Sequence, residues 1–463
     1  MLDKKIVEDV LYAALSYGGD FAEIFVEDKD TRRIKMVSGL VEESISGRDY
    51  GVGIRIFQGV NSIYAYTNDS SRDNLIKVAK EASKALENKV VDVSLNFLKS
   101  DYTNNNEIKK YFNQISMKEK VDLLTKGYES AKSYSDLITQ VTGTYLEEDQ
   151  DILIANTDGI FATDKRVRTR YSIQSVASKD GEMQVGYSAP GKSMGFELYD
   201  EIDVEEVGKE ASRIAVVSVN ADYAPSGKMP VIIDNNFGGV LFHEACGHGL
   251  EAEHVSKGAS VFAGKEGKQV ASKLVTAIDD GTIPNAWGTT NIDDEGTPTK
   301  KNILIEDGIL KSYLIDNLNG RRMNKKSTGS SRRQSYKYAP TSRMNNTYIA
   351  PGDSSLEEMI KNTEYGLYAK NLGGGSVNTA TGDFNFAVME GYMVKNGKLE
   401  NAVRGATLIG SGIKVLEKID MVGDNLGLGQ GMCGASSGSI PVNVGQPSIR
   451  VSSLTVGGRK EDN

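Results

Sequence analysis

Two kinds of apolar pattern open the chain. Ile6, Val10, Ala13 and Ala14 recur at helical spacing among charged residues, which predicts an amphipathic surface helix. Short segments that alternate between apolar and polar residues follow it. They predict an antiparallel meander closed by a helix over Asn74–Leu86, and they read FAEIFVED, RRIKMVSG, VEESIS and GVGIRIF.

The same pattern then recurs. Helical spacing near Lys118–Ser133 and Val204–Val219 brackets three alternating segments, around 138–145, 151–156 and 167–177, with hairpin turn signals at Asp158-Gly159 and Asp180-Gly181. Together these two similar series of helices and strands predict a two-layer α/β domain over residues 1–220. Ala221–Lys228, which contains proline and glycine, is predicted to be a linker.

From Met229 onward glycine is frequent and helical spacing is scarce. Hairpin signals recur at Asp307-Gly308 and Asn396-Gly397, and Ser354–Asn362 is a second good helix candidate after the one over Gly238–Glu253, with Ser354 and Glu357 spaced as a capping box. Residues 229–463 are therefore predicted to form a β-rich barrel or sandwich with one inserted helix that carries the histidines. The fold class is α+β.

Composition narrows the functional classes. The chain has 463 residues, enough for two or three domains, and 54 basic against 63 acidic side chains give a net charge of −9. This charge does not favour nucleic acid or an anionic membrane as partner. Two cysteines are too few for a secreted disulfide framework, the first residues do not resemble a signal peptide, and no apolar run is long enough to cross a bilayer. We expect a cytoplasmic protein.

All three histidines of the chain fall within twelve positions, at His243, His248 and His254, and Glu244 follows the first of them. Imidazole is the commonest neutral metal ligand, and a carboxylate beside a metal-activated water is the usual base for hydrolysis. Residues 1–220 contain neither histidine nor cysteine. The pattern HExxxH therefore predicts a metal-dependent peptidase whose nitrogen and sulfur ligands come from the second domain.

The spacing of His243 and His248 is unusual for a helix. Residues five apart are separated by about 140° on an ideal helix, so the two rings share a face only where the helix is locally unwound. Gly247 precedes His248 and would permit a π-type bulge or a break, and Gly249 adds freedom after it. We therefore predict an irregular helix over Gly238–Glu253.

A catalytic zinc takes three protein ligands and leaves one position for water. Cys433, in a glycine-flanked segment, ranks only slightly above Cys246 and His254 as the third ligand. Glu251 either faces solvent or orients a ligand histidine. Two imidazoles with a thiolate favour zinc, with iron and cobalt as alternatives.

Several segments of the second half resemble the TldD family of metallopeptidases. They are HEACGHGLE at 243–251, IDDEGTP at 292–298, YGLYAKNLGGGSV at 365–377, GATLIGSG at 405–412, GMCG at 431–434 and PVNVGQPSIRV at 441–451. The resemblance implies that His243, His248 and Cys433 bind the metal and that Glu244 is the catalytic base. It implies no role for Cys246 or His254.

The resemblance also implies partners. The expected substrates are peptides or unfolded polypeptide segments, and the expected assembly is a heterodimer with a homologous TldE (PmbA) subunit, with a homodimer as the alternative. A competing hypothesis is a peptide-binding or scaffold subunit with a structural metal. Hydrolysis of a small amide other than a peptide would use the same residues.

Two further features are left open by the sequence. No acidic residue lies between Asp316 and Asp353, where eight basic ones do: Arg321, Arg322, Lys325, Lys326, Arg332, Arg333, Lys337 and Arg343. This stretch could bind phosphate or a peptide carboxylate. The slightly favoured alternative is a solvated loop or a contact to an acidic partner subunit. Gly373-Gly374-Gly375 marks a bulge or a close backbone approach, and it would admit a substrate backbone added as a strand.

Overall fold

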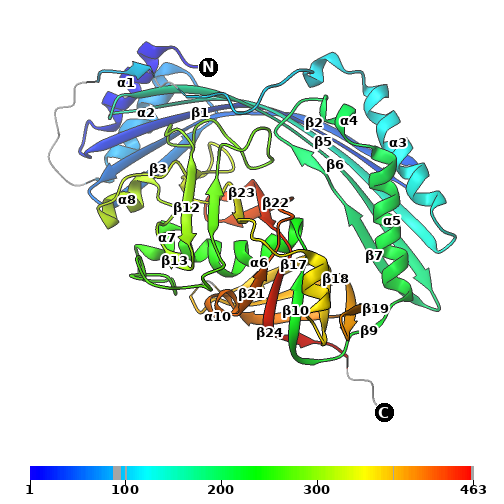
Figure 1. The fold of residues 1–463 in the computed structure, drawn as a ribbon. Helices are drawn as coiled ribbons and strands as arrows, with labels where there is room; N and C mark the ends of the chain where they lie inside the picture. Colours follow the sequence, from blue (N-terminus) through cyan, green and yellow to red (C-terminus); the bar gives the residue numbers. More distant parts are fainter. Residues whose placement is uncertain (87–94, 100–101, 379, 460–463) are drawn as a thin grey trace.

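The computed structural model describes residues 1–86, 95–99, 102–378 and 380–459. Its first half is built on an eight-stranded sheet in the order β3-β2-β1-β5-β6-β4, with β7 and β8 also paired to β6. The sheet arches over the second half of the chain (Figure 1). Its strands are β1 Phe21–Val37, β2 Leu40–Gln58, β3 Asn61–Thr67, β4 Leu98–Lys99, β5 Ile138–Asn156, β6 Ile160–Lys179, β7 Glu182–Ser188 and β8 Gly191–Lys192.

The four predicted short strands are in fact two long ones. FAEIFVED and RRIKMVSG fall in β1, whereas VEESIS and GVGIRIF fall in β2, and the two strands pair along their whole length. The sequence looks interrupted because its polar middle lies between two separate apolar cores, one under each end of the sheet. The predicted turns are confirmed, with Asp180 at φ 51° and Gly181 at φ 82°.

Helices cover the two ends of this sheet (Figure 1). At one end α1 and α2 pack over the first core, and at the other α3 and α5 pack over the second. Each begins close to its predicted start, and α3 has a capping box in which Ser116 and Glu119 bond each other's backbone. The bounds are α1 Lys4–Ala14, α2 Arg72–Ser83, η1 Phe112–Gln114, α3 Met117–Ser133, α4 Leu198–Glu201 and α5 Val204–Asn220.

The second half is rich in strands, as predicted. In one sheet β17, β10, β24, β20 and β18 follow in order and β18 pairs back to β17, which closes a barrel; β19, β9 and β21 extend it. A six-stranded sheet has the order β13-β12-β11-β16-β23-β22, and β14 pairs with β15. The strands are β9 Asp222–Tyr223, β10 Gly227–Ile233, β11 Ala277–Asp280, β12 Lys301–Glu306, β13 Ile309–Leu310, β14 Ser331–Arg332, β15 Thr341–Ser342, β16 Asn346–Ile349, β17 Tyr365–Val377, β18 Asp383–Lys395, β19 Lys398–Arg404, β20 Thr407–Ser411, β21 Ile419–Val422, β22 Gly427–Ala435, β23 Gly438–Gln446 and β24 Ile449–Gly457.

Two local predictions are wrong. Ala221–Lys228 is not a free linker, because β9 pairs with β19 and β10 begins at Gly227. The capping box near residue 355 is shifted by one position: Ser355 and Glu358 cap α9 (Leu356–Lys361), and both Ser-x-x-Glu pairs fit the motif in the sequence. We keep residues 1–220 and 229–463 as our proposed division into domains. Two further helices are α8 Asn317–Met323 and α10 Gly412–Glu417, and none of the described helices has the length and apolarity to cross a membrane.

The basic stretch packs against acidic residues of its own chain. Arg333 Nη2 lies 2.7 Å from Oε1 of Glu23 on β1, and Lys337 Nζ lies 3.4 Å from Asp49 on β2. These two pairs join the second half of the chain to the first sheet, and Arg333 offsets the charge of the buried Glu23 carboxylate. Other members of the stretch, such as Lys326, are exposed, so a solvated loop or a contact to a partner subunit stays a prediction for them.

Candidate metal centre

The histidines lie on a helix that changes its hydrogen-bonding pattern from turn to turn. A 3₁₀ turn, η2 (Asn236–Gly239), leads into α6 (Val240–Phe242), a π turn η3 (His243–Gly247), a 3₁₀ turn η4 (His248–Leu250) and α7 (Ala252–Val255). The predicted π-type irregularity is confirmed. The helical pattern that we predicted up to Glu253 is interrupted at Glu251, which is extended, with φ −73° and ψ 128°.

Glycine is required at position 247 for space. The backbone there is ordinary helix, with φ −55° and ψ −49°, but an added Cβ would lie 2.2 Å from Sδ of Met344. An added Cβ at Gly249 would likewise lie 2.9 Å from the Phe262 ring. The glycines therefore let the π turn pack closely against its neighbours, rather than supply the backbone freedom that we expected.

The structure brings His243, His248 and Cys433 together. Nε2 of His243 lies 3.2 Å from Sγ of Cys433, and Nε2 of His248 lies 3.3 Å from the same sulfur. One ligand atom from each residue lies within 4.8 Å of the other two, and all three side chains are buried. Cys433 is on β22, the edge strand of the six-stranded sheet, so the donors converge from two distant segments.

Electrostatics favour a thiolate at this position. Burial opposes ionisation of Cys433, but the neighbouring His243 and His248 outweigh it and hold the pKa of the thiol well below its usual value. Burial would lower the pKa of His248, yet Glu251 and Cys433 raise it well above its usual value. The contacts between these side chains thus stabilise the charged forms of both Cys433 and His248.

This donor set fits a zinc ion. Two imidazole nitrogens and one thiolate are ligands that zinc prefers, and three ligands leave a fourth tetrahedral position. Nδ1 of His248 donates to Oε2 of Glu251 over 3.0 Å, which leaves Nε2 to face the sulfur. Nδ1 of His243 is buried without a hydrogen-bond partner among the described residues. Glu251 therefore orients His248, a candidate ligand, and this contact agrees with one of its two predicted roles.

Glu244 is placed to act beside the donors rather than among them. Its Oε2 lies 3.7 Å from Nε2 of His248, and 27% of its side chain is exposed, against 10% for that of His248. A carboxylate at the accessible side of the cluster is within reach of a water held there.

The other two candidates lie outside the cluster. Cys246 is buried in the apolar core, next to Gly412, and burial raises the pKa of its thiol. His254 is half-buried on α7 and is not one of the three grouped donors. Sequence reasoning missed the role of Arg343, which is buried and donates to the carbonyl of Cys433. Its only sequence signal was membership of the basic stretch.

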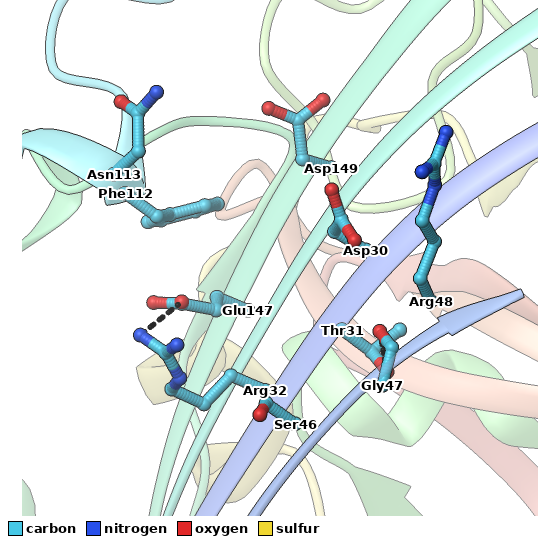
Figure 2. Close-up of a pocket in the computed structure, with 10 residues that line it drawn as sticks. All are labelled: Asp30, Thr31, Arg32, Ser46, Gly47, Arg48, Phe112, Asn113, Glu147 and Asp149. Carbon is cyan, nitrogen blue, oxygen red and sulfur yellow. Dashed lines mark hydrogen bonds and ion pairs between the residues drawn. The ribbon is translucent and has the colours of Figure 1, made fainter.

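A separate cavity of about 490 Å³ lies on the first sheet, where Arg32 and Glu147 pair at 3.5 Å (Figure 2). Its lining mixes acidic, basic and neutral side chains and includes none of the candidate metal ligands. It therefore has no part in the candidate metal centre.

Fold and site together define a two-part α+β protein with a buried His/His/Cys cluster. Family models match most of the chain: "PmbA/TldA metallopeptidase domain 1" at residues 22–86, the central domain at 110–219 and the C-terminal domain at 226–458. The chain belongs to the PmbA/TldD family, as the sequence predicted.

Individual relatives agree with this assignment. The chain is 38% identical to "Metalloprotease TldD homolog" of Buchnera aphidicola over 95% of its own length and 93% of that protein. It is 28% identical to "Zinc metalloprotease TldD homolog" of Saccharolobus solfataricus, over 86% of its length and 82% of that protein. The crystal structure of TldE from Thermococcus kodakarensis has the same fold, with a TM-score of 0.79 at 20% identity over 98% of this chain and 100% of that one.

Proposed function

We propose that this chain is a metal-dependent peptidase that hydrolyses peptide bonds in peptides or unfolded segments. The observation that carries the proposal is the convergence of His243, His248 and Cys433, with their ligand atoms within 4.8 Å of one another. Relatives of known name are called metalloproteases, which supports the same activity here.

His243, His248 and Cys433 would hold one zinc ion. Bound zinc supplies Lewis-acid chemistry: it lowers the pKa of a water toward neutrality and stabilises negative charge on a carbonyl oxygen. Glu251 fixes the ring of His248 through Nδ1. The buried walls of the cluster keep competing solvent away, so each charge there acts at low dielectric.

Glu244 would act as the general base. Its carboxylate faces His248 from the exposed side of the cluster, where it accepts a proton from the attacking water and returns one to the leaving amine. It would not be a ligand, since two histidines and one cysteine already fill three positions.

Substrate, partner and compartment are also proposals. Peptides or unfolded segments are the proposed substrates, and a TldE/PmbA-like subunit is the proposed partner, with a second copy of this chain as the alternative. The shared fold with TldE supports a relationship between the two kinds of subunit. We propose the cytoplasm as the compartment.

A peptide-binding or scaffold subunit with a structural metal is the second candidate. Structural zinc sites usually have four protein ligands and are closed to solvent. Here three donors cluster, and a partly exposed glutamate, Glu244, lies 3.7 Å from Nε2 of His248. Those two features favour catalysis.

The test is to replace Glu244 with glutamine. Glu244→Gln should retain zinc and lose roughly 10²–10⁴-fold in peptide turnover, because only the proton transfer is removed. His248→Ala should lose both zinc and turnover. Glu306→Gln is the control, since Glu306 lies on β12, outside the cluster, and pairs with Lys311 at 3.0 Å. Normal cleavage by Glu244→Gln would refute the role of this base.

A further inference from the structure

Arg343 is a buried cation close to the cluster that the proposed chemistry does not use. Its side chain is 0% exposed, and it reaches both segments that supply the candidate ligands. An isolated buried guanidinium is strongly unfavourable, so a chain that retains one needs partners for it.

One side of the guanidinium holds the strand that carries Cys433. Nη2 donates to the carbonyl oxygen of Cys433 itself. Nη1 donates over 2.9 Å to Oγ of Ser437 and over 2.9 Å to the carbonyl oxygen of Gly438. These contacts fix the end of β22 and its turn into β23.

The other side faces the partner of His248. Nε of Arg343 lies 3.8 Å from Oε1 of Glu251, whose side chain is 2% exposed. Neither of these two atoms has a hydrogen-bond partner among the described residues, whereas the second oxygen of Glu251 bonds Nδ1 of His248. The guanidinium is thus the counter-charge for the carboxylate that orients the ligand histidine.

The flanking residues strengthen this arrangement. Oγ of Ser342 accepts from the backbone N–H of Glu253 over 3.2 Å, and Met344 fills the space left by the missing side chain of Gly247. Three consecutive residues, 342–344, therefore contact the histidine-bearing helix in three places.

We propose that Arg343 is a positioning residue that sets the distance between the histidine pair and Cys433, and so sets the affinity for the metal. The proposal rests on the metal-binding part of the proposed function. Geometry rather than charge alone carries the role, because a planar guanidinium can contact the Cys433 carbonyl, the following turn and Glu251 at once. A lysine ammonium in the same place cannot.

The test measures the zinc dissociation constant of the full chain by competition with a chromophoric chelator. Arg343→Lys and Glu251→Gln should each weaken zinc binding by roughly 10–100-fold, as is usual for groups that orient ligands. The double variant should lose less than the product of the two single losses, because the two side chains share the contact between Nε and Oε1, whereas Arg343 alone holds the Cys433 segment. With cobalt in place of zinc, the thiolate-to-metal absorption band should lose intensity in both single variants.

Arg55→Lys is the matched control. Arg55 is 1% exposed and paired with Glu23 and Glu295. The same substitution there removes a buried guanidinium group that contacts no candidate ligand. It should lower the unfolding temperature and leave zinc affinity unchanged. If Arg343→Lys does not fold, Ser437→Ala, which removes the hydroxyl that accepts from Nη1 of Arg343, takes its place and should also weaken zinc binding. Wild-type zinc affinity in the folded single variants, or additive losses in the double variant, would overturn the role of Arg343. Absence of zinc binding by the wild-type chain would instead overturn the proposed function and this inference with it.

Discussion

Sγ of Cys433 lies 3.2 Å from Nε2 of His243, although 190 positions separate the two residues in the sequence. The contact exists only because β22 pairs with β23, which in turn pairs with β16 beside the histidine-bearing helix. The candidate metal centre is therefore a product of the whole second half of the chain. It should form before any metal arrives.

Removal of the metal should abolish peptide cleavage and leave the fold largely intact. The large apolar core of the second half is built from aliphatic and aromatic side chains that need no ion. We expect a chelator to eliminate turnover with little change in the circular dichroism spectrum, and added zinc to restore it. Cooperative unfolding that coincides with metal loss would favour the scaffold hypothesis.

Gly247→Ala should weaken both stability and metal binding. Its Cβ would lie 2.2 Å from Sδ of the fully buried Met344, so either the Met344 side chain or the π turn must shift. Overpacking of this kind costs about 1–3 kcal/mol, measurable by urea unfolding. Gly47→Ala is the control, since the nearest atom to its added Cβ is 4.0 Å away. Equal stability of the two variants would contradict the steric argument.

Asp279→Asn should change how stability depends on pH. Burial raises the pKa of Asp279 to about 6, despite hydrogen bonds from Asn345 and Thr347, and its second oxygen has no partner among the described residues. A folded-state pKa above the unfolded value means that the wild type loses stability as pH rises from about 4 to about 6. The loss is of the order of 3 kcal/mol.

The amide that replaces the carboxyl group in this variant does not ionise, so this part of the pH dependence should disappear. Denaturant unfolding at pH 4, where the carboxyl is protonated, and at pH 8 would measure it. If wild type and Asp279→Asn lose the same stability between the two conditions, the assignment of the raised pKa is wrong.

Gly374→Val tests whether a substrate backbone passes over the glycine run. Gly374 lines a cavity of about 890 Å³ together with Phe237, Met389 and Met432, and nothing lies within 4 Å of an added Cβ. The fold should therefore accept valine. If the substrate lies there, KM should rise by roughly tenfold or more, equivalent to about 1.4 kcal/mol of lost binding. Unchanged peptide cleavage would remove this hypothesis.

Local patterns predicted much of the fold. Helices such as Met117–Ser133, and hairpins such as that at Asp180-Gly181, follow from short-range spacing and turn chemistry. The lengths of β1 and β2 could not be predicted in this way. Their polar middle is buried or exposed according to what packs across the sheet. The charged segment Asp28–Arg33 does not indicate which part of the chain packs against it.

In the candidate site, too, local patterns predicted one part and could not predict the part that depends on distant contacts. The spacing of His243 and His248 around Gly247 predicted the π turn, because helix geometry is local. The choice of Cys433 over Cys246 needed the resemblance, since no local rule brings a strand 190 residues away to a helix. The part played by Arg343 could not be predicted at all, because a basic side chain in a basic stretch looks exposed.

The most direct test of the account is anomalous scattering at the zinc absorption edge from crystals of the zinc-loaded chain. We predict one strong peak within coordination distance, about 2.0–2.3 Å, of Nε2 of His243, Nε2 of His248 and Sγ of Cys433. A native fold with its zinc peak elsewhere, or with Cys433 remote from the ion, would contradict it.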